Sequence, residues 1–293
     1  MAISASMVKE LRERTGAGMM ECKKALTETD GDMEAAIDLM RKSGAAKAEK
    51  KAGRTAAEGL IIIRHSDDNK KAVMVEINCE TDFVAKDDNF TTFADAVADR
   101  VLGSDAADVE ALMSLPLHDG EETTIEEARQ ALVSKIGENM NVRRFVRLNA
   151  QGQVASYRHG VKIGVIVDIV DGNDELGKDV AMHVAATNPM CVSEEQVPQE
   201  ALDKEKDIFV AQAKESGKPD NIIEKMVTGR MKKYLAEITL VGQSFVKDPD
   251  QTVGKLLGSA NASVASFTRF EVGEGIEKKK EDFAAEVMAQ VKG

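Results

Sequence analysis

The side chains that could do chemistry in this chain are carboxylates, histidines and cysteines, and their spacing matches no catalytic motif. The Walker-type loop G-x-x-x-x-G-K-[ST], H-E-x-x-H and G-x-S-x-G do not occur in the sequence. Gly16 and Gly18 begin like a dinucleotide-binding fingerprint, but Glu21 stands at the third glycine position. The four histidines are far apart in the sequence: His65, His118, His159 and His183. We therefore expect no covalent catalysis, no cofactor and no bound metal.

The three cysteines, Cys22, Cys79 and Cys191, are widely spaced and include no C-x-x-C pair. This pattern predicts neither a disulfide framework nor a zinc site, and each cysteine is expected to be a small buried hydrophobe. The formal net charge is -12, which opposes general binding to nucleic acids and anionic membranes. A protein partner is the better expectation. A basic run at residues 47–54 could meet a phosphate, although such runs are usually solvated.

Asp82 and Phe83 follow a predicted strand. A phenylalanine at a strand end can form an apolar wedge, and burying it in a contact would contribute about 1.5–3 kcal/mol. The neighbouring aspartate adds a negative charge. The residues alone favour the other interpretation, in which Phe83 enters the local core and Asp82 caps the next turn.

The elements that must position this pair begin with three short helices. Apolar residues at helical spacing follow Ser4, and residues 15–18 interrupt them. The second helix, with Met19 and Cys22 available for its apolar face, runs to a turn at residues 29–31. Asp32 is expected to cap the third helix and Gly44 to end it. Residues 45–57 are rich in alanine and lysine, which predicts an exposed linker that is helical in part.

A hairpin followed by a helix is predicted next. Residues 59–63 and 72–77 are rich in β-branched side chains and flank a polar turn. The apolar residues of the helix that follows recur at i, i+3, i+4 and i+7: Phe90, Phe93, Ala94 and Val97. The same arrangement returns at residues 154–158 and 163–170, with a second helix carrying Leu176, Val180, His183 and Val184. This repetition indicates a divergent duplication of one ββα unit.

The last third of the chain predicts a projecting helical hairpin. Charged sequence with apolar faces lies on either side of a Gly/Pro turn at residues 216–219. Strand-like sequence returns at residues 237–241 and 264–271. A helix over about residues 280–291 is expected to end the chain, with an apolar stripe: Phe283, Ala284, Val287 and Val291.

These elements predict an α+β fold with a small N-terminal three-helix module, duplicated α+β core subdomains, a protruding antiparallel helical hairpin and a C-terminal helix. The expected modules are the N-terminal helical module and linker (1–54), the first core subdomain (55–150), the second core subdomain (151–192 and 236–275), the protruding hairpin (193–235) and the C-terminal helical module (276–293).

Several stretches spread along nearly the whole chain resemble the elongation factor Ts family. They are LRERTGAGMMECKKAL at residues 11–26, ETDFVAK at 80–86, KIGEN at 135–139, GRMKK at 229–233 and RFEVGEGIE at 269–277. The resemblance implies an N-terminal module of the ubiquitin-associated type. It also implies a guanine nucleotide exchange factor for elongation factor Tu, which binds Tu with GDP, displaces magnesium and promotes GDP release so that GTP can bind.

The resemblance also assigns roles to particular residues. Thr81, Asp82, Phe83 and Val84 match the family segment that enters the partner GTPase beside its magnesium and disturbs the metal site. Four further residues match partner-binding positions: Lys23, His159, Phe283 and Val287. From the residues alone, Lys23 would lie on a solvated helix face and His159 would be a turn histidine bonded to backbone.

Two other function classes fit parts of the sequence. A chaperone-like or scaffolding partner of a GTPase, without exchange activity, would use the projecting hairpin, and an enzyme with an unrecognised acidic site would use the carboxylates. The apolar hairpin could also form a homodimer or a 2:2 complex with elongation factor Tu. The sequence contains neither a signal peptide nor a run of about 18 apolar residues, so we expect a cytoplasmic protein.

Overall fold

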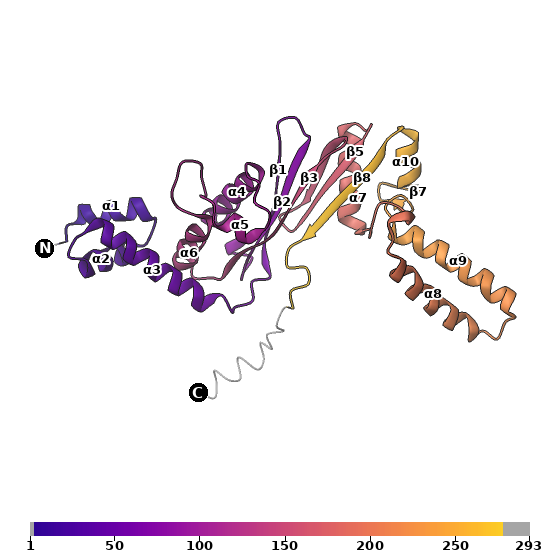
Figure 1. The fold of residues 1–293 in the computed structure, drawn as a ribbon, viewed down its shortest axis with the longest axis horizontal. Coiled ribbons are helices and arrows are strands. Elements are labelled where there is room, and N and C mark those ends of the chain that lie inside the picture. The colour runs from indigo at the N-terminus through magenta and orange to yellow at the C-terminus, as the bar shows by residue number, and fades with distance from the viewer. Residues whose placement is uncertain (1–2, 278–293) are drawn as a thin grey trace. The chain divides into compact units, whose positions relative to one another are not determined.

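The computed structural model describes residues 3–277 and has the α+β architecture that the sequence predicts (Figure 1). The chain divides into two compact units. Unit 1 comprises Met1–Ile62, Val75–Phe145 and Val272–Gly293, and unit 2 comprises Ile63–Met74 and Val146–Glu271. The C-terminal helix expected from about residue 280, with Phe283 and Val287, lies outside the described residues.

The predicted N-terminal three-helix module is present and consists of α1 (Ala5–Thr15), α2 (Met19–Glu28) and α3 (Met33–Lys51). The Ser4 hydroxyl accepts the Met7 N–H at 3.3 Å and caps α1, while Asp32 accepts the Ala35 N–H at 3.0 Å and caps α3. Gly16 ends α1 with φ +65°, a conformation that favours glycine. The core of the module is formed by these buried side chains: Val8, Leu11, Cys22, Ala25, Leu26 and Ala36.

The prediction that Gly44 ends the third helix was wrong, because α3 continues to Lys51. The expected linker at residues 45–57 is therefore helical over its first half. Alanine and lysine are strong helix formers, and α3 packs against α6 (Ile125–Ile136), where Gly44 and Ala48 are buried. This packing outweighs the single unfavourable glycine.

The first predicted hairpin and its helix are confirmed as β1 (Glu58–His65), β2 (Lys71–Cys79) and α4 (Asp88–Leu102). The four apolar side chains predicted for one face of α4 are all buried: Phe90, Phe93, Ala94 and Val97. The short helix α5 (Val109–Met113) and then α6 lead to β3 (Met140–Asn149), which pairs with β2 to give the order β1-β2-β3. Thr124 and Glu127 form a capping box at the start of α6.

The second hairpin and helix are confirmed as β4 (Gln153–His159), β5 (Ile163–Val170) and α7 (Asp174–Thr187). Both neighbours of β5 are antiparallel to it, with β4 on one side and β8 (Ser263–Glu271) on the other. Helix α7 packs against β4 and β5. The core between them contains Val165, Val167, Val180 and Val184.

The two sheets repeat one connection pattern. In each, a hairpin is followed by a helix, and the chain later returns to place a third strand beside the second strand of that hairpin. Each hairpin also has a glycine close to its first strand, Gly59 or Gly152, where a Cβ atom would collide with a carbonyl of the second strand. These shared features support the predicted duplication.

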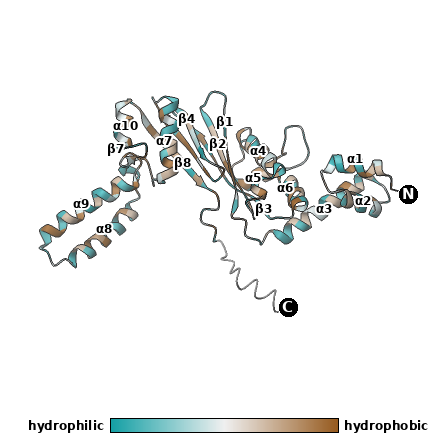
Figure 2. Cartoon of the chain, turned by 180° about the vertical axis from the view of Figure 1, so that it is seen from behind, coloured by the Kyte–Doolittle hydropathy of each residue, from teal (hydrophilic) through white to brown (hydrophobic). Residues whose placement is uncertain are grey.

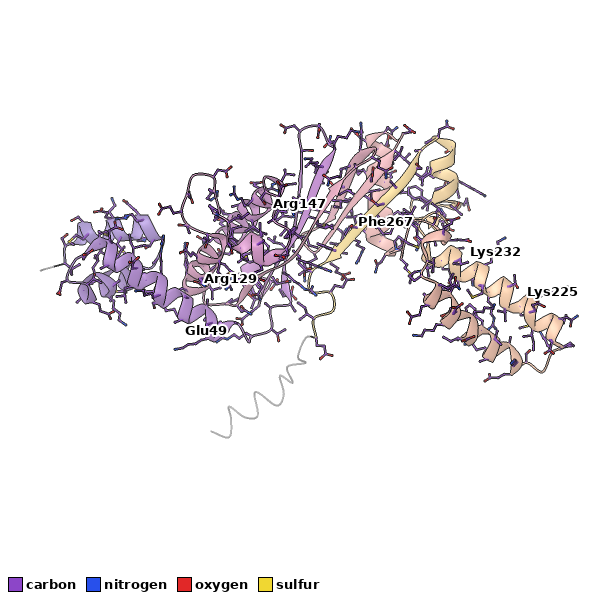
Figure 3. The ribbon with its side chains drawn as sticks, in the orientation of Figure 1. Glu49, Arg129, Arg147, Lys225, Lys232 and Phe267 are labelled. Carbon is purple, nitrogen blue, oxygen red and sulfur yellow. The ribbon has the colours of Figure 1, made fainter. Side chains whose placement is uncertain are left out.

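The projecting hairpin is formed by α8 (Gln199–Lys214) and α9 (Asp220–Ile238), which pack against each other. Ala213, Ile223 and Val227 are its buried residues. Figure 2 shows hydrophobic and hydrophilic residues side by side along both helices, and Figure 3 labels Lys225 and Lys232 on α9.

The strand expected at residues 237–241 was wrong. Helix α9 continues to Ile238, because the N–H and the hydroxyl of Thr239 both donate to the Leu235 carbonyl, at 3.1 and 2.8 Å. Thr239 makes only an isolated bridge with Cys191. Before β8, the chain forms three short elements: β6 (Ser244–Phe245), β7 (Asp248–Thr252) and α10 (Val253–Ser259).

A buried carboxylate fixes the segment that follows β8. Glu76 is fully buried, and it accepts bonds from the Gly273 N–H at 2.8 Å, Arg143 at 2.9 Å and Arg144 at 2.6 Å. Burial alone would raise the pKa of the Glu76 carboxyl, but these hydrogen bonds outweigh it and hold the pKa below its usual value. Residues 272–274 are thereby tied to β2 and β3 within unit 1.

Candidate functional site

Phe83 is the most exposed large apolar side chain in the described part of the chain, at 82%. It lies between the end of β2 at Cys79 and the 3-10 helix η1 (Val84–Lys86). The next two residues, Val84 and Ala85, are buried. The alternative in which Phe83 enters the local core is therefore wrong, and an apolar ring is presented to solvent from a segment whose neighbours are anchored.

Asp82 lies beside that ring on the exposed side of the segment. Its carboxylate pairs with Lys86 at 2.9 Å, one helical turn later. The turn that follows, η1, has no side-chain cap, so the expectation that Asp82 caps it was also wrong. Helix α4 is capped by Asp87, which accepts the Asn89 N–H at 2.8 Å. Bonds from the Asn89 side chain and backbone lower the pKa of the Asp87 carboxyl. Asp82 is left as an exposed negative charge with one lysine partner.

Thr81 is fixed by hydrogen bonds to Glu138 and Cys79. Its N–H and hydroxyl both donate to Glu138, at 3.0 and 2.7 Å, and its carbonyl accepts the Cys79 thiol at 3.1 Å. Burial raises the pKa of the Cys79 thiol to about 12, and the Glu138 carboxylate acts in the same direction. Cys79 is therefore a neutral buried group and not a nucleophile. The prediction of burial also holds for Cys22, whereas Cys191 is half-buried.

The two predicted contact residues of the described region lie in different units. Lys23 is exposed on α2 in unit 1, as expected for a solvated helix face. His159 is exposed at the end of β4 in unit 2. Its Nδ1 lies 3.2 Å from the Tyr157 hydroxyl, so the partner found for this ring is a side chain and not the backbone.

The sequence did not predict two features of the site: the exposure of Met19 and Met20 beside Lys23, and the contact of Glu138 with Thr81. Met19 was expected on the buried face of α2, yet it is 59% exposed and Met20 is 77% exposed. Both methionines precede Lys23 on the same helix and add apolar surface there. Glu138 was also given no role, although it lies in one of the stretches that resemble the family. Its contact with Thr81 joins residues far apart in the sequence, which no local pattern indicates.

A cavity of about 710 Å³ lies within unit 1, between the N-terminal module and helices α4 and α6. Lys47 lines it and donates to Glu21 at 2.5 Å and to Ser134 at 3.2 Å. Lys47, the first residue of the basic run, is therefore paired with side chains of the same unit. Among the described residues, no cluster of His, Cys, Asp and Glu could hold a metal ion. No helix there has the length and apolarity needed to cross a membrane.

A family model matches the larger part of the chain, and full-length relatives match all of it. The family model described as elongation factor TS matches residues 80–274, which include the exposed segment and Glu138. The elongation factor Ts of Thioalkalivibrio sulfidiphilus is 67% identical, with 100% of each chain covered. That of Methylococcus capsulatus is 64% identical over 100% of this chain and 99% of its own length, and that of Alkalilimnicola ehrlichii is 61% identical with both chains fully covered. The chain belongs to the elongation factor Ts family, and so to the proteins of translation.

Proposed function

We propose that this chain is a guanine nucleotide exchange factor for elongation factor Tu in translation elongation. It binds Tu with GDP, displaces magnesium and promotes GDP release so that GTP can bind. The observation that carries the proposal is the 82% exposure of Phe83 beside the exposed carboxylate of Asp82. Family membership supports the choice of partner.

In this proposal, residues 81–84 dislocate the partner's magnesium. The Phe83 ring enters an apolar site on the partner and contributes about 1.5–3 kcal/mol there. Asp82 brings negative charge close to the magnesium and the phosphates. Thr81 and Val84 hold the two ends of the segment. No bond is made or broken, so the protein acts as an exchange factor and not as an enzyme.

Exchange follows from linkage: a protein that binds nucleotide-free Tu more tightly than Tu with GDP weakens GDP by the same factor. Weakening GDP a thousandfold needs about 4 kcal/mol, more than one phenylalanine supplies. We therefore propose that Lys23, His159, Phe283 and Val287 anchor the complex while Phe83 and Asp82 loosen the metal site.

The wider organisation is proposed on the same basis. The five modules predicted from the sequence remain the proposed domains, and work on elongation factor Tu would place the protein in the cytoplasm. The hairpin α8–α9 is proposed as the surface for a homodimer or a 2:2 complex. The partial exposure of Ile208 and Ile222, at 39% and 38%, supports that surface.

The test is stopped-flow release of a fluorescent GDP from bacterial elongation factor Tu, with magnesium and excess unlabelled nucleotide. We expect the release rate to rise with the concentration of this protein until it saturates. Complex formation without any acceleration would overturn the proposal and favour a scaffolding partner of the GTPase. Turnover of a small molecule by the isolated protein would favour an enzyme.

A further inference from the structure

The carboxylate of Glu138 gathers three hydrogen-bond donors from the base of the exposed segment. One oxygen accepts the backbone N–H groups of Glu80 and Thr81, at 3.1 and 3.0 Å, and the other accepts the Thr81 hydroxyl at 2.7 Å. Bonds from neutral donors to an ionised acceptor are stronger than those between neutral groups. Glu138 therefore holds both backbone and side chain at the point where the chain leaves β2.

The contact between the two stretches is reciprocal. While Glu138 accepts backbone N–H groups from residues 80 and 81, the Glu80 side chain accepts the Asn139 N–H at 2.6 Å. Arg54 lies 3.6 Å from the same Glu80 carboxylate. Each stretch thus uses a side chain to bind the other's backbone, which fixes their separation and their relative direction.

The turn that carries Glu138 is itself held by neighbouring elements of unit 1. Lys51, at the end of α3, donates to the Gly137 carbonyl. The Asn139 amide donates to the Arg54 carbonyl at 2.8 Å. Arg129 of α6, labelled in Figure 3, donates to the Met140 carbonyl at 2.8 Å. The residues on either side of Glu138 are therefore fixed by bonds that do not involve the exposed segment.

Between Thr81 and Lys86, hydrogen bonds from backbone N–H groups over three or four residues fix the turn that contains Phe83. The Thr81 hydroxyl accepts the Val84 N–H at 3.4 Å, and the Thr81 carbonyl accepts the Ala85 N–H at 3.3 Å. The Phe83 carbonyl accepts the Lys86 N–H at 3.1 Å. Phe83 is consequently the exposed tip of a turn that is bonded on both sides.

We propose that Glu138 is a positioning residue for Phe83: by holding the backbone of Glu80 and Thr81, it keeps the exposed segment in the one conformation that presents the ring to the partner. The inference rests on the proposed function of Phe83 in nucleotide release. Glu138 touches neither the partner's nucleotide nor its metal in this proposal. Its effect passes entirely through the segment 81–84.

The experiment uses the full chain and the GDP-release assay over a range of concentrations, which separates the saturated rate from the half-saturating concentration. Glu138→Ala should lower the saturated rate about tenfold or more, because small misplacements of a working group have large effects on rate. The half-saturating concentration should change less than about threefold, since the anchoring contacts lie elsewhere. Glu138→Gln keeps one acceptor oxygen for both N–H groups and should restore the rate to within about threefold.

Amide hydrogen exchange of the free protein provides a readout independent of activity. Glu138→Ala should accelerate exchange at Glu80 and Thr81 about tenfold or more. The matched control is Asp168→Ala in unit 2, because Asp168 also accepts two successive backbone N–H groups, from Gln151 at 2.8 Å and Gly152 at 3.0 Å. It should leave the saturated release rate unchanged. Thr81→Val removes the hydroxyl's bonds to Glu138 and to the Val84 N–H but keeps the backbone bond to Glu138, and it should show smaller effects in the same directions if Glu138→Ala does not fold.

A double-mutant cycle separates this inference from the proposed function. If Phe83→Ala releases GDP as fast as the natural sequence, the function proposed for the segment fails. If Phe83→Ala is slow but Glu138→Ala is not, the function stands and the role of Glu138 is overturned. Unchanged amide exchange in Glu138→Ala would overturn it as well. We expect Glu138→Ala to add little in a chain that already carries Phe83→Ala.

Discussion

Phe83 is an apolar side chain that remains exposed although burial would be favourable. Its burial would contribute about 1.5–3 kcal/mol, yet the ring stays in solvent while Val84 and Ala85 take the buried positions. From the residue types, the local core was the simpler prediction for Phe83, because a lone phenylalanine after a strand is usually buried. Thr81, which precedes the exposed pair, is bonded to Glu138, a residue distant in sequence and therefore outside the reach of any local pattern.

At this scale we predict that Phe83→Ala slows GDP release from elongation factor Tu more than it weakens complex formation. The side chain is exposed, so its loss should leave the free protein's stability within about 0.5 kcal/mol. Saturated release rates and the dissociation constant of the complex are the quantities to compare. Release at the natural rate combined with lost binding would show that Phe83 is an anchor and not a wedge.

Among the elements, patterns that extend over many residues agreed with prediction, whereas the predictions from Gly44 and from the short β-rich stretch after Glu237 failed. The hairpins β1-β2 and β4-β5 and the apolar face of α4 agree with prediction because strand and helix periods extend over many residues. Gly44 was overridden by the packing of α3 on α6, and the β-rich stretch after Glu237 by the end of α9. At Gly44 tertiary contact outweighed local propensity, whereas at the end of α9 the bonds from Thr239 to the Leu235 carbonyl extend the helix.

The continuation of α3 predicts that Gly44→Ala is stabilising. A Cβ atom there would meet its nearest neighbour, the Gln130 carbonyl oxygen, at 3.8 Å, which is ordinary van der Waals contact. Alanine in a helix interior is favoured over glycine by about 0.5–1 kcal/mol, and urea unfolding should show a gain of that size. Gly59→Ala is the matched control and should destabilise, because Gly59 has φ +140° and its Cβ would collide with the Ile77 carbonyl. A loss of stability in Gly44→Ala would mean that α3 and α6 lie closer together.

Helix α7 carries a titrating group that links stability to pH. His183 is fully buried, its Nε2 donates to Gln243 at 2.9 Å, and its Nδ1 accepts the Val246 N–H at 3.2 Å, so the ring is neutral. Burial lowers its pKa below 6.5, and the bond to Gln243 offsets only part of this. The unfolded chain therefore takes up a proton first as the pH falls below 6.5, and the free energy of unfolding should decrease from there.

Urea unfolding between pH 5 and pH 7 tests this link. At each pH, the free energy of unfolding is compared between the natural chain and His183→Gln. The variant should lose part of the pH dependence, while a remaining part comes from His65, whose pKa is also lowered by burial. His118→Gln, at an exposed position, controls for the replacement itself. An unchanged slope in His183→Gln would exclude His183 as the source.

For the whole molecule, the proposed contacts are spread over both units. Lys23 belongs to unit 1 and His159 to unit 2, and the sequence predicted neither separation nor proximity for them, since long-range placement is not encoded in local patterns. The α+β class and the repeated ββα unit were predictable, because they follow from the order of the elements along the chain, whereas the strand β3 was not predicted.

We predict that Lys23→Ala and His159→Ala each weaken complex formation about fivefold, or ~1 kcal/mol, and leave the saturated release rate within about twofold. The effects should add in the double variant, because the two residues belong to different units of this chain. Isothermal titration with elongation factor Tu gives the affinities, and stopped-flow release gives the rates. A collapse of the saturated rate in either single variant would place that residue in the release step.

The anchored turn beneath Phe83 has a consequence for the kinetics of encounter. A tip that ordered itself only on contact would be competent in a fraction of the molecules, and the apparent affinity would fall by that fraction. Here the segment is already bonded through Thr81 and Glu138 in the free chain. Association should therefore be a single concentration-dependent phase, without a preceding step of conformational selection. In nearly every collision in the right orientation, the Phe83 ring should already have its binding conformation.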